Sequence, residues 1–350
     1  MKRFLLFLIS LLVGIGLLSF TLKYVGLEEI KNAFRVFTGW HGLIIFGLTL
    51  LMILVGTWKW KEILSEEGVK IPTIKLIKPY LAGFSVTFLA PMLLWGGEIF
   101  RGYFLKEKHS VPWAKGMASV IIDRMMEWTA SLVVIIFGLL FFFYKISLPP
   151  QKIGIIIAVV FFIFAGGVFY FYFKVFKKES ILEVLLKIFG LGKIKEKAIF
   201  LEIEKETFKF FKLENRKMWF VFFLSLLRSA VMLIRAWVLI IFLGKNIGWI
   251  AALSVLGFSY ISSLIPIPTA LGSHEIIQTF VFSSLGLGFS SATAFAMILR
   301  GSEFLVSLLG LTILFKQGIE FFNNFIFKKM ENFINNKDES KTSSIEKPLT

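Results

Sequence analysis

Long apolar runs separated by short basic gaps recur along the whole chain. A helix of about 20 apolar residues is long enough to cross the hydrocarbon core of a bilayer. The pattern therefore predicts an all-α polytopic membrane protein with about 6–8 membrane helices. The predicted full spans are Phe4–Leu22, Trp40–Trp58, Pro112–Tyr144, Ile153–Phe173, Met218–Leu243 and Phe289–Phe315.

A further apolar stretch, residues 79–95, is interrupted before it completes an ordinary span. It contains Pro91 and leads into Gly96-Gly97, and the amphipathic, basic segment Glu98–His109 follows. Because proline and glycine break helices, we interpret the two segments as short helices that enter the membrane and turn back. One ordinary span is the alternative.

The second half of the chain contains a matching interruption. The apolar residues 249–265 end at Pro266-Ile267-Pro268, and residues 272–287, which begin with Gly272, follow. We interpret these segments as a second re-entrant or broken helix hairpin. The second hairpin and the helix after it would then repeat the first hairpin and its following helix.

Charged and proline residues stand in the same order in both halves. From Pro to Glu is seven residues in each copy, and from Glu to Arg is 26 in the first and 25 in the second. The two sets are Pro91, Glu98, Arg124 and Glu127, and Pro268, Glu275, Arg300 and Glu303. Charged groups in lipid cost about 2.5–3.5 kcal/mol each on insertion scales, so they are rarely present without a function. Proline-broken segments at matching places in two halves point to the substrate site of a transporter.

The basic residues indicate how the chain is oriented. The net charge of +16 does not indicate nucleic-acid binding, because the basic residues fall in the gaps between apolar runs, as the positive-inside rule describes. If the Pro91 segment is re-entrant, the basic segments all lie on the cytoplasmic side together with both termini. They are the N-terminal residues 2–3, residues 59–78, 101–115 and 174–217, and the tail. The two hairpins then have opposite orientations, which makes the repeat an inverted one.

We expect one integral domain over residues 1–330 of a multi-pass cell-membrane protein. Its parts are repeat 1 at about 79–144, a cytoplasmic amphipathic segment at about 174–217, and repeat 2 at about 249–315. Residues 331–350 are polar and are expected to form a disordered cytoplasmic tail. The chain contains no cysteine, and its three histidines are far apart, so we expect no metal site and no cofactor.

The candidate substrate-binding residues are the charged groups of the two repeats and their neighbours. They are Glu98, Arg101, Asp123, Arg124, Glu127, His274, Glu275, Arg300 and Glu303, and the expected hairpin breaks are Pro91, Gly96, Gly97, Pro266, Pro268 and Gly272. Within one helix, residues three apart can neutralise each other, as Arg124 and Glu127 could. Cross-pairing of Glu98 with Arg124 is the alternative. Arginine suits bidentate phosphate binding in either arrangement.

This ordered set of motifs resembles the lysylphosphatidylglycerol synthase transmembrane-region family, also called the flippase-like domain family. The resemblance covers nearly the whole chain, although Thr269-Ala270-Leu271 replaces the usual glycine-rich turn after the second proline. It implies translocation of a lipid between leaflets. The chain is expected to lack a synthase or glycosyltransferase domain, since about 35 residues follow its last predicted span.

We therefore predict a flippase or scramblase for an anionic or polyprenyl-phosphate-type lipid. The expected partners are membrane lipids, and a separately encoded lipid-modifying enzyme is a further candidate. The alternatives are a carrier for a small solute or ion, a membrane-embedded lipid headgroup transferase, and a non-transporting anchor for another enzyme. The sequence contains no phosphate-binding loop, so an ATPase activity of this chain is excluded.

Overall fold

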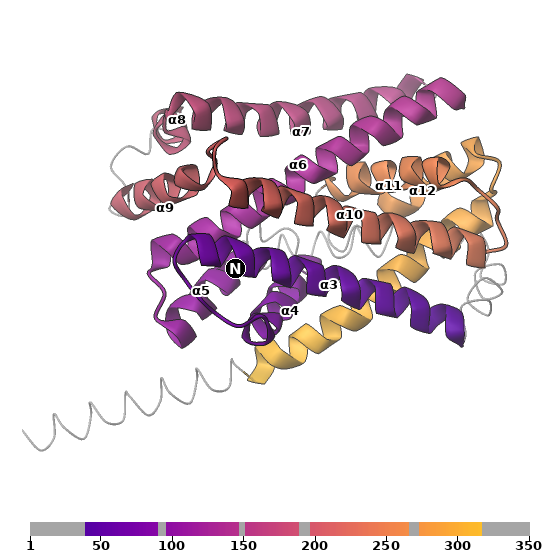
Figure 1. The fold of residues 1–350 in the computed structure, drawn as a ribbon. Coiled ribbons are helices and arrows are strands. Elements are labelled where there is room, and N and C mark those ends of the chain that lie inside the picture. Colours follow the sequence, from indigo (N-terminus) through magenta and orange to yellow (C-terminus); the bar gives the residue numbers. More distant parts are fainter. Residues whose placement is uncertain (1–38, 90–95, 147–150, 189–196, 266–272, 317–350) are drawn as a thin grey trace, which may run out of the picture.

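The structure is a computed structural model that describes residues 39–89, 96–146, 151–188, 197–265 and 273–316 (Figure 1). All regular elements in these residues are helices. They are α3 (Trp40–Glu66), α4 (Thr73–Leu89), α5 (Gly96–His109), α6 (Trp113–Lys145), α7 (Gln151–Lys177), α8 (Ile181–Ile188), α9 (Lys197–Phe210), α10 (Arg216–Phe242), α11 (Trp249–Ser263), α12 (Ser273–Ser284) and a last helix, Phe289–Lys316. The predicted span Phe4–Leu22, Pro91, Pro266, Pro268, Gly272 and residues 331–350 lie outside the described residues.

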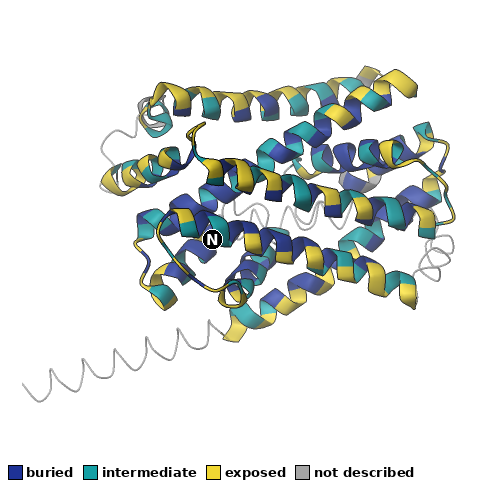
Figure 2. Ribbon diagram, in the orientation of Figure 1, coloured by how far each residue is buried: buried dark blue, intermediate teal, exposed yellow. Residues whose placement is uncertain are grey.

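Five described helices are long and apolar enough to cross a membrane: α3, α6, α7, α10 and Phe289–Lys316. They confirm the all-α polytopic fold and coincide with five of the six predicted full spans. Much of α7 is exposed, as the yellow parts of that helix in Figure 2 show. Its exposed side chains include Phe162, Ile163 and Phe169. Extended apolar surfaces of this kind are typical of helices that face lipid.

The two predicted helix pairs are present as short helices. α4 and α5 have 17 and 14 residues and pack against each other, as do α11 and α12 with 15 and 12. One prediction was wrong in detail: α4 begins at Thr73 rather than Pro79, and the proline lies inside the helix. Membrane helices tolerate an internal proline because neighbouring groups can satisfy the freed carbonyl. The re-entrant placement of the pairs stays a prediction.

Helix bounds reveal that the repeat includes one more helix than the sequence suggested. The bounds of α10 follow those of α3 by 176 residues at both ends, since 40 becomes 216 and 66 becomes 242. The same shift relates Arg124 to Arg300 and Glu127 to Glu303. The matched sets are therefore α3–α4–α5–α6 and α10–α11–α12 with the last helix.

The equivalent helices α3 and α10 are antiparallel neighbours. His41, early in α3, lies 4.2 Å from the ring of Phe242 near the end of α10. At the opposite ends, Lys217 and Glu62 form an ion pair of 2.5 Å. Two helices that correspond in the repeat but run in opposite directions are what an inverted repeat requires.

Each hairpin packs against the long helix of the other set. On one side, Ser85 of α4 donates to the carbonyl of Ser307 at 2.7 Å. On the other, Ser254 of α11 donates to the carbonyl of Gly138 in α6 at 2.9 Å. A Cβ at Gly138 would lie only 2.9 Å from the carbonyl oxygen of Leu253, so these helices approach as closely as small residues permit. These reciprocal contacts, of α4 with the last helix and of α11 with α6, join the two halves into one bundle.

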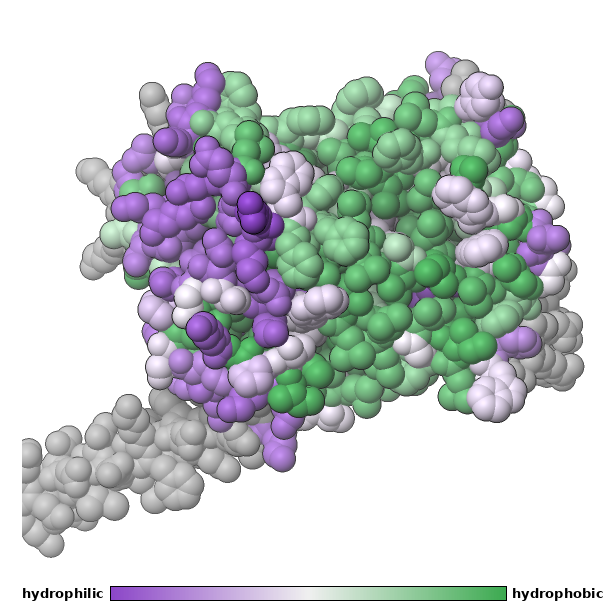
Figure 3. Space-filling view, in the orientation of Figure 1, coloured by the Kyte–Doolittle hydropathy of each residue, from purple (hydrophilic) through white to green (hydrophobic). Residues whose placement is uncertain are grey.

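The basic segments gather at one end of the bundle. Lys115, just inside α6, donates to the backbone carbonyl of Glu67 after α3 at 3.0 Å, and the Lys217–Glu62 pair joins α10 to α3 at the same end. Figure 3 shows this hydrophilic end on the left, over α9, beside a broad hydrophobic surface. Parts of the predicted segments 59–78, 101–115 and 174–217 thus contribute to one face, whereas Lys59 and Arg101 are buried inside the bundle.

Candidate functional site

A cluster of seven charged side chains lies inside the bundle, on three helices of the first set and on α10. We call it the first charged cluster. Its members are Lys59 of α3, Glu98 and Arg101 of α5, Asp123, Arg124 and Glu127 of α6, and Arg228 of α10. Five of these seven were predicted as substrate-binding residues, and the structure brings all five together.

Lys59 lies at the centre of the first charged cluster and is fully buried. Its ammonium group lies 2.8 Å from Asp123 Oδ1 and 3.0 Å from Glu127 Oε1. It also donates to the backbone carbonyl of Asp123 at 3.2 Å. Two hydrogen bonds and two carboxylate charges around the ammonium offset the cost of removing this charge from water.

The predicted placement of Lys59 in a basic loop was wrong. Residues 59–66 continue α3 for two more turns, since the buried Trp60, Ile63 and Leu64 extend its packed face. The sequence carried one signal for this: Lys59 and Arg235 are related by the same 176-residue shift as the motif arginines. Both are buried cations on equivalent helices.

Arg101 is held by contacts from three other helices, α3, α4 and α6. Its guanidinium donates to Asp123 Oδ2 at 2.8 Å and lies 4.0 Å from the ring centre of Trp60 and 4.7 Å from that of Tyr80. Trp60 is itself fixed by a hydrogen bond from its indole nitrogen to Ser119 Oγ at 3.1 Å. Arg101 is therefore locked by cation–π contacts and one ion pair, and it positions its neighbours.

Glu98, in the first turn of α5, is paired with Arg124 rather than with Arg101. This is the cross-pairing that the sequence left open, and it ties the first hairpin to α6. Arg124 also contacts Glu127 at 3.4 Å, so the pairing within the helix is present as well. Glu127 further pairs with Arg228 of α10 at 3.3 Å.

The first charged cluster has one more positive than negative charge. Four cations face three carboxylates, and no other acidic side chain in the described part of the chain forms an ion pair with these cations. Exposure is greatest at Arg124, with 27% of its side chain accessible, and at Arg228, with 18%. An additional anion would therefore meet these two guanidinium groups before the buried members.

The second half contains a smaller set of charges, which we call the second charged cluster: Arg235, Arg300 and Glu303. Arg235 of α10 contacts Glu303 Oε1 at 2.8 Å and donates to Thr49 of α3 at 3.1 Å. Arg300 contacts Glu303 Oε2 at 3.3 Å. Arg235 thus takes the place that Lys59 has in the first half, with a glutamate of the long helix as its partner.

A small cavity of about 60 Å³ adjoins the second charged cluster. Arg235, Arg300 and Glu303 line it together with His274, whose Nε2 lies 3.0 Å from Ser263 Oγ. This volume can hold a few water molecules. His274 is therefore a hydrogen-bonded neighbour of the cluster, while the Glu275 side chain lies outside the described residues.

The two halves differ by the loss of one complete ion pair. Where the first half has Arg101 and Asp123, the second has Gln278 and Leu299. Gln278 is buried and donates instead to Ser259 Oγ at 2.5 Å. Removing both partners together avoids an unpaired buried charge, so the second half remains stable with fewer charges.

Comparison with known proteins identifies the family to which the chain belongs. The profile described as lysylphosphatidylglycerol synthase TM region matches residues 7–310, which is most of the chain. The chain belongs to this family. The matched range contains both charged clusters and both hairpins of this lysylphosphatidylglycerol synthase TM-region protein.

Two relatives are similar over nearly their whole length. A UPF0104 membrane protein of Methanocaldococcus jannaschii is 23% identical over 311 residues, which covers 85% of this chain and 90% of the relative. A UPF0104 membrane protein of Pyrococcus horikoshii is 26% identical over 329 residues, covering 89% and 96%. No solved structure matches the chain. The family and the relatives establish a multi-pass membrane protein of the lysylphosphatidylglycerol synthase TM-region type.

Proposed function

We propose that the protein moves an anionic or polyprenyl-phosphate-type lipid between the leaflets of the cell membrane. The observation that carries this proposal is the excess positive charge of the first charged cluster, with Arg124 and Arg228 as its most accessible cations. A lipid phosphate would supply the missing negative charge. The family's association with a lipid synthase supports a lipid rather than a soluble substrate.

Arg124 and Arg228 suit a phosphate group in chemistry and in placement. Both are guanidinium groups, which bind phosphate oxygens through paired N–H donors. Both already contact the same carboxylate, Glu127, at 3.4 and 3.3 Å, so their charges lie close together. Lys59 and Arg101 lie behind them and hold Glu127 and Asp123 in position.

The incoming phosphate would displace Glu98 from Arg124. Glu98 lies in the first turn of α5, where the helix dipole stabilises a carboxylate even without its arginine partner. Releasing this pair would also release the tie between the first hairpin and α6. Substrate binding would in this way be linked to hairpin movement, which alternating access requires.

The testing experiment is reconstitution of the full chain into liposomes containing fluorescent phosphatidylglycerol. A reductant added outside bleaches only the outer leaflet, so bleaching beyond roughly half of the label reports translocation. We expect Arg124→Gln to slow translocation roughly ten- to hundredfold, because a hydrogen bond to a charged group contributes about 1.5–3 kcal/mol. Arg216→Gln, the same change at the exposed start of α10, should leave the rate unchanged.

A second variant separates function from folding. Arg124→Gln leaves Glu98 without its arginine, whereas Glu98→Gln with Arg124→Gln removes both charges of the pair. Wild-type rates in both variants would show that this site is wrongly assigned. If wild-type protein moves neither phosphatidylglycerol nor a polyprenyl phosphate, translocation itself is wrong, and solute transport or headgroup transfer must be tested instead.

The proposed topology has both termini and the basic end of the bundle in the cytoplasm. The gathering of three basic segments at one end supports it, because positive loops remain on the cytoplasmic side. Within the proposed domain 1–330, the repeats would extend to include α3 and α10. Anionic lipids would be its partners, and a separately encoded enzyme would supply the lipid.

A further inference from the structure

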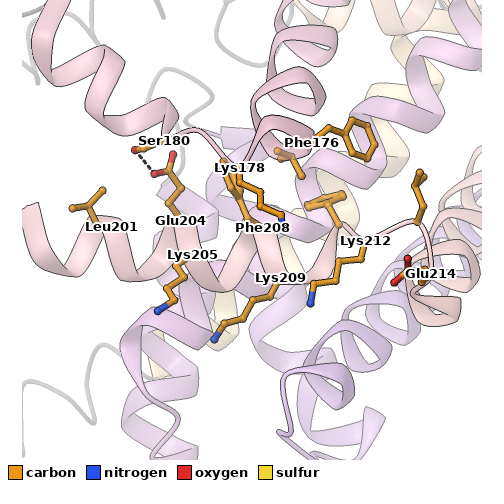
Figure 4. Close-up of a pocket in the computed structure, with 13 residues that line it drawn as sticks. Phe176, Lys178, Ser180, Leu201, Glu204, Lys205, Phe208, Lys209, Lys212 and Glu214 are labelled. Atoms are coloured by element: carbon orange, nitrogen blue, oxygen red, sulfur yellow. Dashed lines mark hydrogen bonds between the residues drawn. The ribbon is translucent and has the colours of Figure 1, made fainter.

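A second, larger cavity lies at the basic end of the bundle, away from both charged clusters. It measures about 740 Å³ and lies between the end of α7, the start of α8, and α9 with the loop that follows it (Figure 4). Its volume is within the range of small-ligand sites, roughly 300–1,000 Å³. It is open on one side, and all of its lining residues belong to the segment 175–214.

Four lysines line this cavity, which we call the basic pocket: Lys178, Lys205, Lys209 and Lys212. Figure 4 shows the side chains of Lys205, Lys209 and Lys212 pointing to the same side of α9. Lys209 is paired with Glu206 at 2.6 Å, whereas the described structure gives Lys205 and Lys212 no carboxylate partner. These two lysines are available to an anion.

Two carboxylates also line the basic pocket, and one of them is already used. Glu204 accepts from the backbone nitrogens of Ile181 and Leu182 at 2.7 and 3.0 Å and from Ser180 Oγ. It thereby caps the N-terminus of α8, and its charge is offset by that helix end. Glu214 is exposed at the rim. Four lysines against two glutamates leave the pocket positive.

Aromatic and apolar side chains place the basic pocket at the level of the membrane surface. Phe176, 54% exposed, and Phe208 line it, and Phe176 belongs to the last turn of the spanning helix α7. The next residue is Lys177, whose ammonium lies 4.4 Å from the ring centre of Phe173. Lysines near the ends of membrane helices extend in this way along apolar surface to place their charge at the membrane interface. Leu213, 63% exposed, adds apolar surface at the rim.

We propose that the basic pocket binds the headgroup of an anionic phospholipid of the adjacent leaflet, with Lys205 and Lys212 contacting its phosphate. The exposed Phe176 and Leu213 lie where the acyl chains would leave the pocket. The site is separate from the charged clusters, so this inference does not rest on the proposed translocation. It gives the segment 174–217 a binding role that senses or anchors to lipid charge.

The test is native mass spectrometry of the full chain in detergent, titrated with phosphatidylglycerol and, separately, with phosphatidylcholine. Lys205→Gln with Lys212→Gln is expected to weaken the first phosphatidylglycerol bound roughly thirtyfold, because an interfacial lysine contributes about 1 kcal/mol. Lys70→Gln with Lys106→Gln makes the same charge change at exposed lysines outside the pocket and should leave this binding unchanged. Replacing Lys205 and Lys212 by arginine should retain it.

Several results would overturn the proposal. If the Lys205→Gln/Lys212→Gln and Lys70→Gln/Lys106→Gln variants lost phosphatidylglycerol affinity equally, the effect would be a general attraction to positive charge and not binding in the pocket. Full competition by millimolar glycerol 1-phosphate would make the ligand a soluble phosphate rather than a lipid. Loss of the first bound phosphatidylglycerol in Arg124→Gln would place that binding in the first charged cluster. Retained binding in Arg124→Gln, even in protein inactive in translocation, supports a separate lipid site.

Discussion

Most charged side chains of the two clusters form ion pairs with side chains from other helices. Lys59 illustrates this, since its ammonium contacts Asp123 and Glu127 and is closed off from solvent. A buried ion pair contributes modestly as a whole, but removal of one partner leaves an uncompensated charge in an apolar surrounding. The residues that hold the cluster are therefore more critical to folding than those at its accessible edge.

Lys59→Met is expected to destabilise the folded protein strongly, by about 3–5 kcal/mol, because it leaves Asp123 and Glu127 with fewer cations. The midpoint of thermal unfolding in detergent measures this. Lys61→Met, two residues on, changes a lysine whose side chain is 40% exposed and should shift the midpoint little. Equal midpoints for the two variants would contradict a central role for Lys59.

The stability of the protein is also expected to depend on pH, through the buried carboxyl group of Glu67. Burial raises the pKa of Glu67, in the loop after α3, to about 7, and Glu206 adds to the rise. The ordinary value is 4.5, so the folded protein holds a proton here that the unfolded chain releases. Stability from this group is complete below pH 4.5 and is lost as the pH rises towards about 7.

Glu67→Gln should therefore be more stable than wild type above pH 7 and should lose this part of the pH dependence. Thermal unfolding of both proteins between pH 5 and 8 checks it. Glu107→Gln removes an exposed carboxylate that does not contribute to the pKa shift of Glu67, and it serves as the control. A variant curve that runs parallel to that of wild type across this range would show that Glu67 does not titrate there.

At the scale of elements, close packing determines how each hairpin holds its shape. Gly97 of α5 lies against Gly83 of α4, and a Cβ at Gly97 would overlap the carbonyl of Gly83 and the hydroxyl of Thr87. Glycine at this crossing lets the two backbones approach. The position of Glu98, one residue later, depends on that approach, and so does its contact with Arg124.

Gly97→Ala is expected to separate α4 from α5 and to slow translocation at least as much as Arg124→Gln does. Gly166→Ala is the matched control, because a Cβ there, in the middle of α7, meets no atom within 4 Å. Initial rates in the liposome assay compare the two. Normal transport by folded Gly97→Ala would mean that the hairpin tolerates a wider crossing.

For the whole molecule, the antiparallel arrangement of α3 and α10 makes the two halves run in opposite senses. Each hairpin then packs on the long helix of the other half, so neither half can complete its packing alone. The basic loops lie at one end, and the loop after α10 lies at the other, about 40 Å away along that helix. Because the basic end is expected to face the cytoplasm, the loop after α10 is expected to face the opposite side of the membrane.

The natural chain has no cysteine, so single cysteines report topology directly. Lys245→Cys, after α10, is expected to react with a membrane-impermeant maleimide in intact cells. Lys205→Cys, on α9, should react only after the membrane is opened, because α9 is expected to face the cytoplasm. Labelling of the unchanged chain gives the background, and the reverse pattern would invert the proposed orientation.

The sequence by itself determined the membrane class, five of the described spans and the two helix pairs. Length and hydropathy suffice for these, because the bilayer imposes a fixed thickness on every helix that crosses it. The repeated Pro, Glu and Arg positions also located the charged residues. The 176-residue shift between Lys59 and Arg235 was present in the sequence as well, although only the helix bounds made it meaningful.

Only the tertiary structure decided which charges meet. Sequence spacing allows Arg101 to pair with Glu98 on its own helix, yet Trp60 and Tyr80 of other helices direct it to Asp123. Partners separated by 68 residues, such as Lys59 and Glu127, leave no local pattern to read. Which charged side chains form ion pairs depends on how the helices are oriented by close packing. That packing exists only in the assembled bundle.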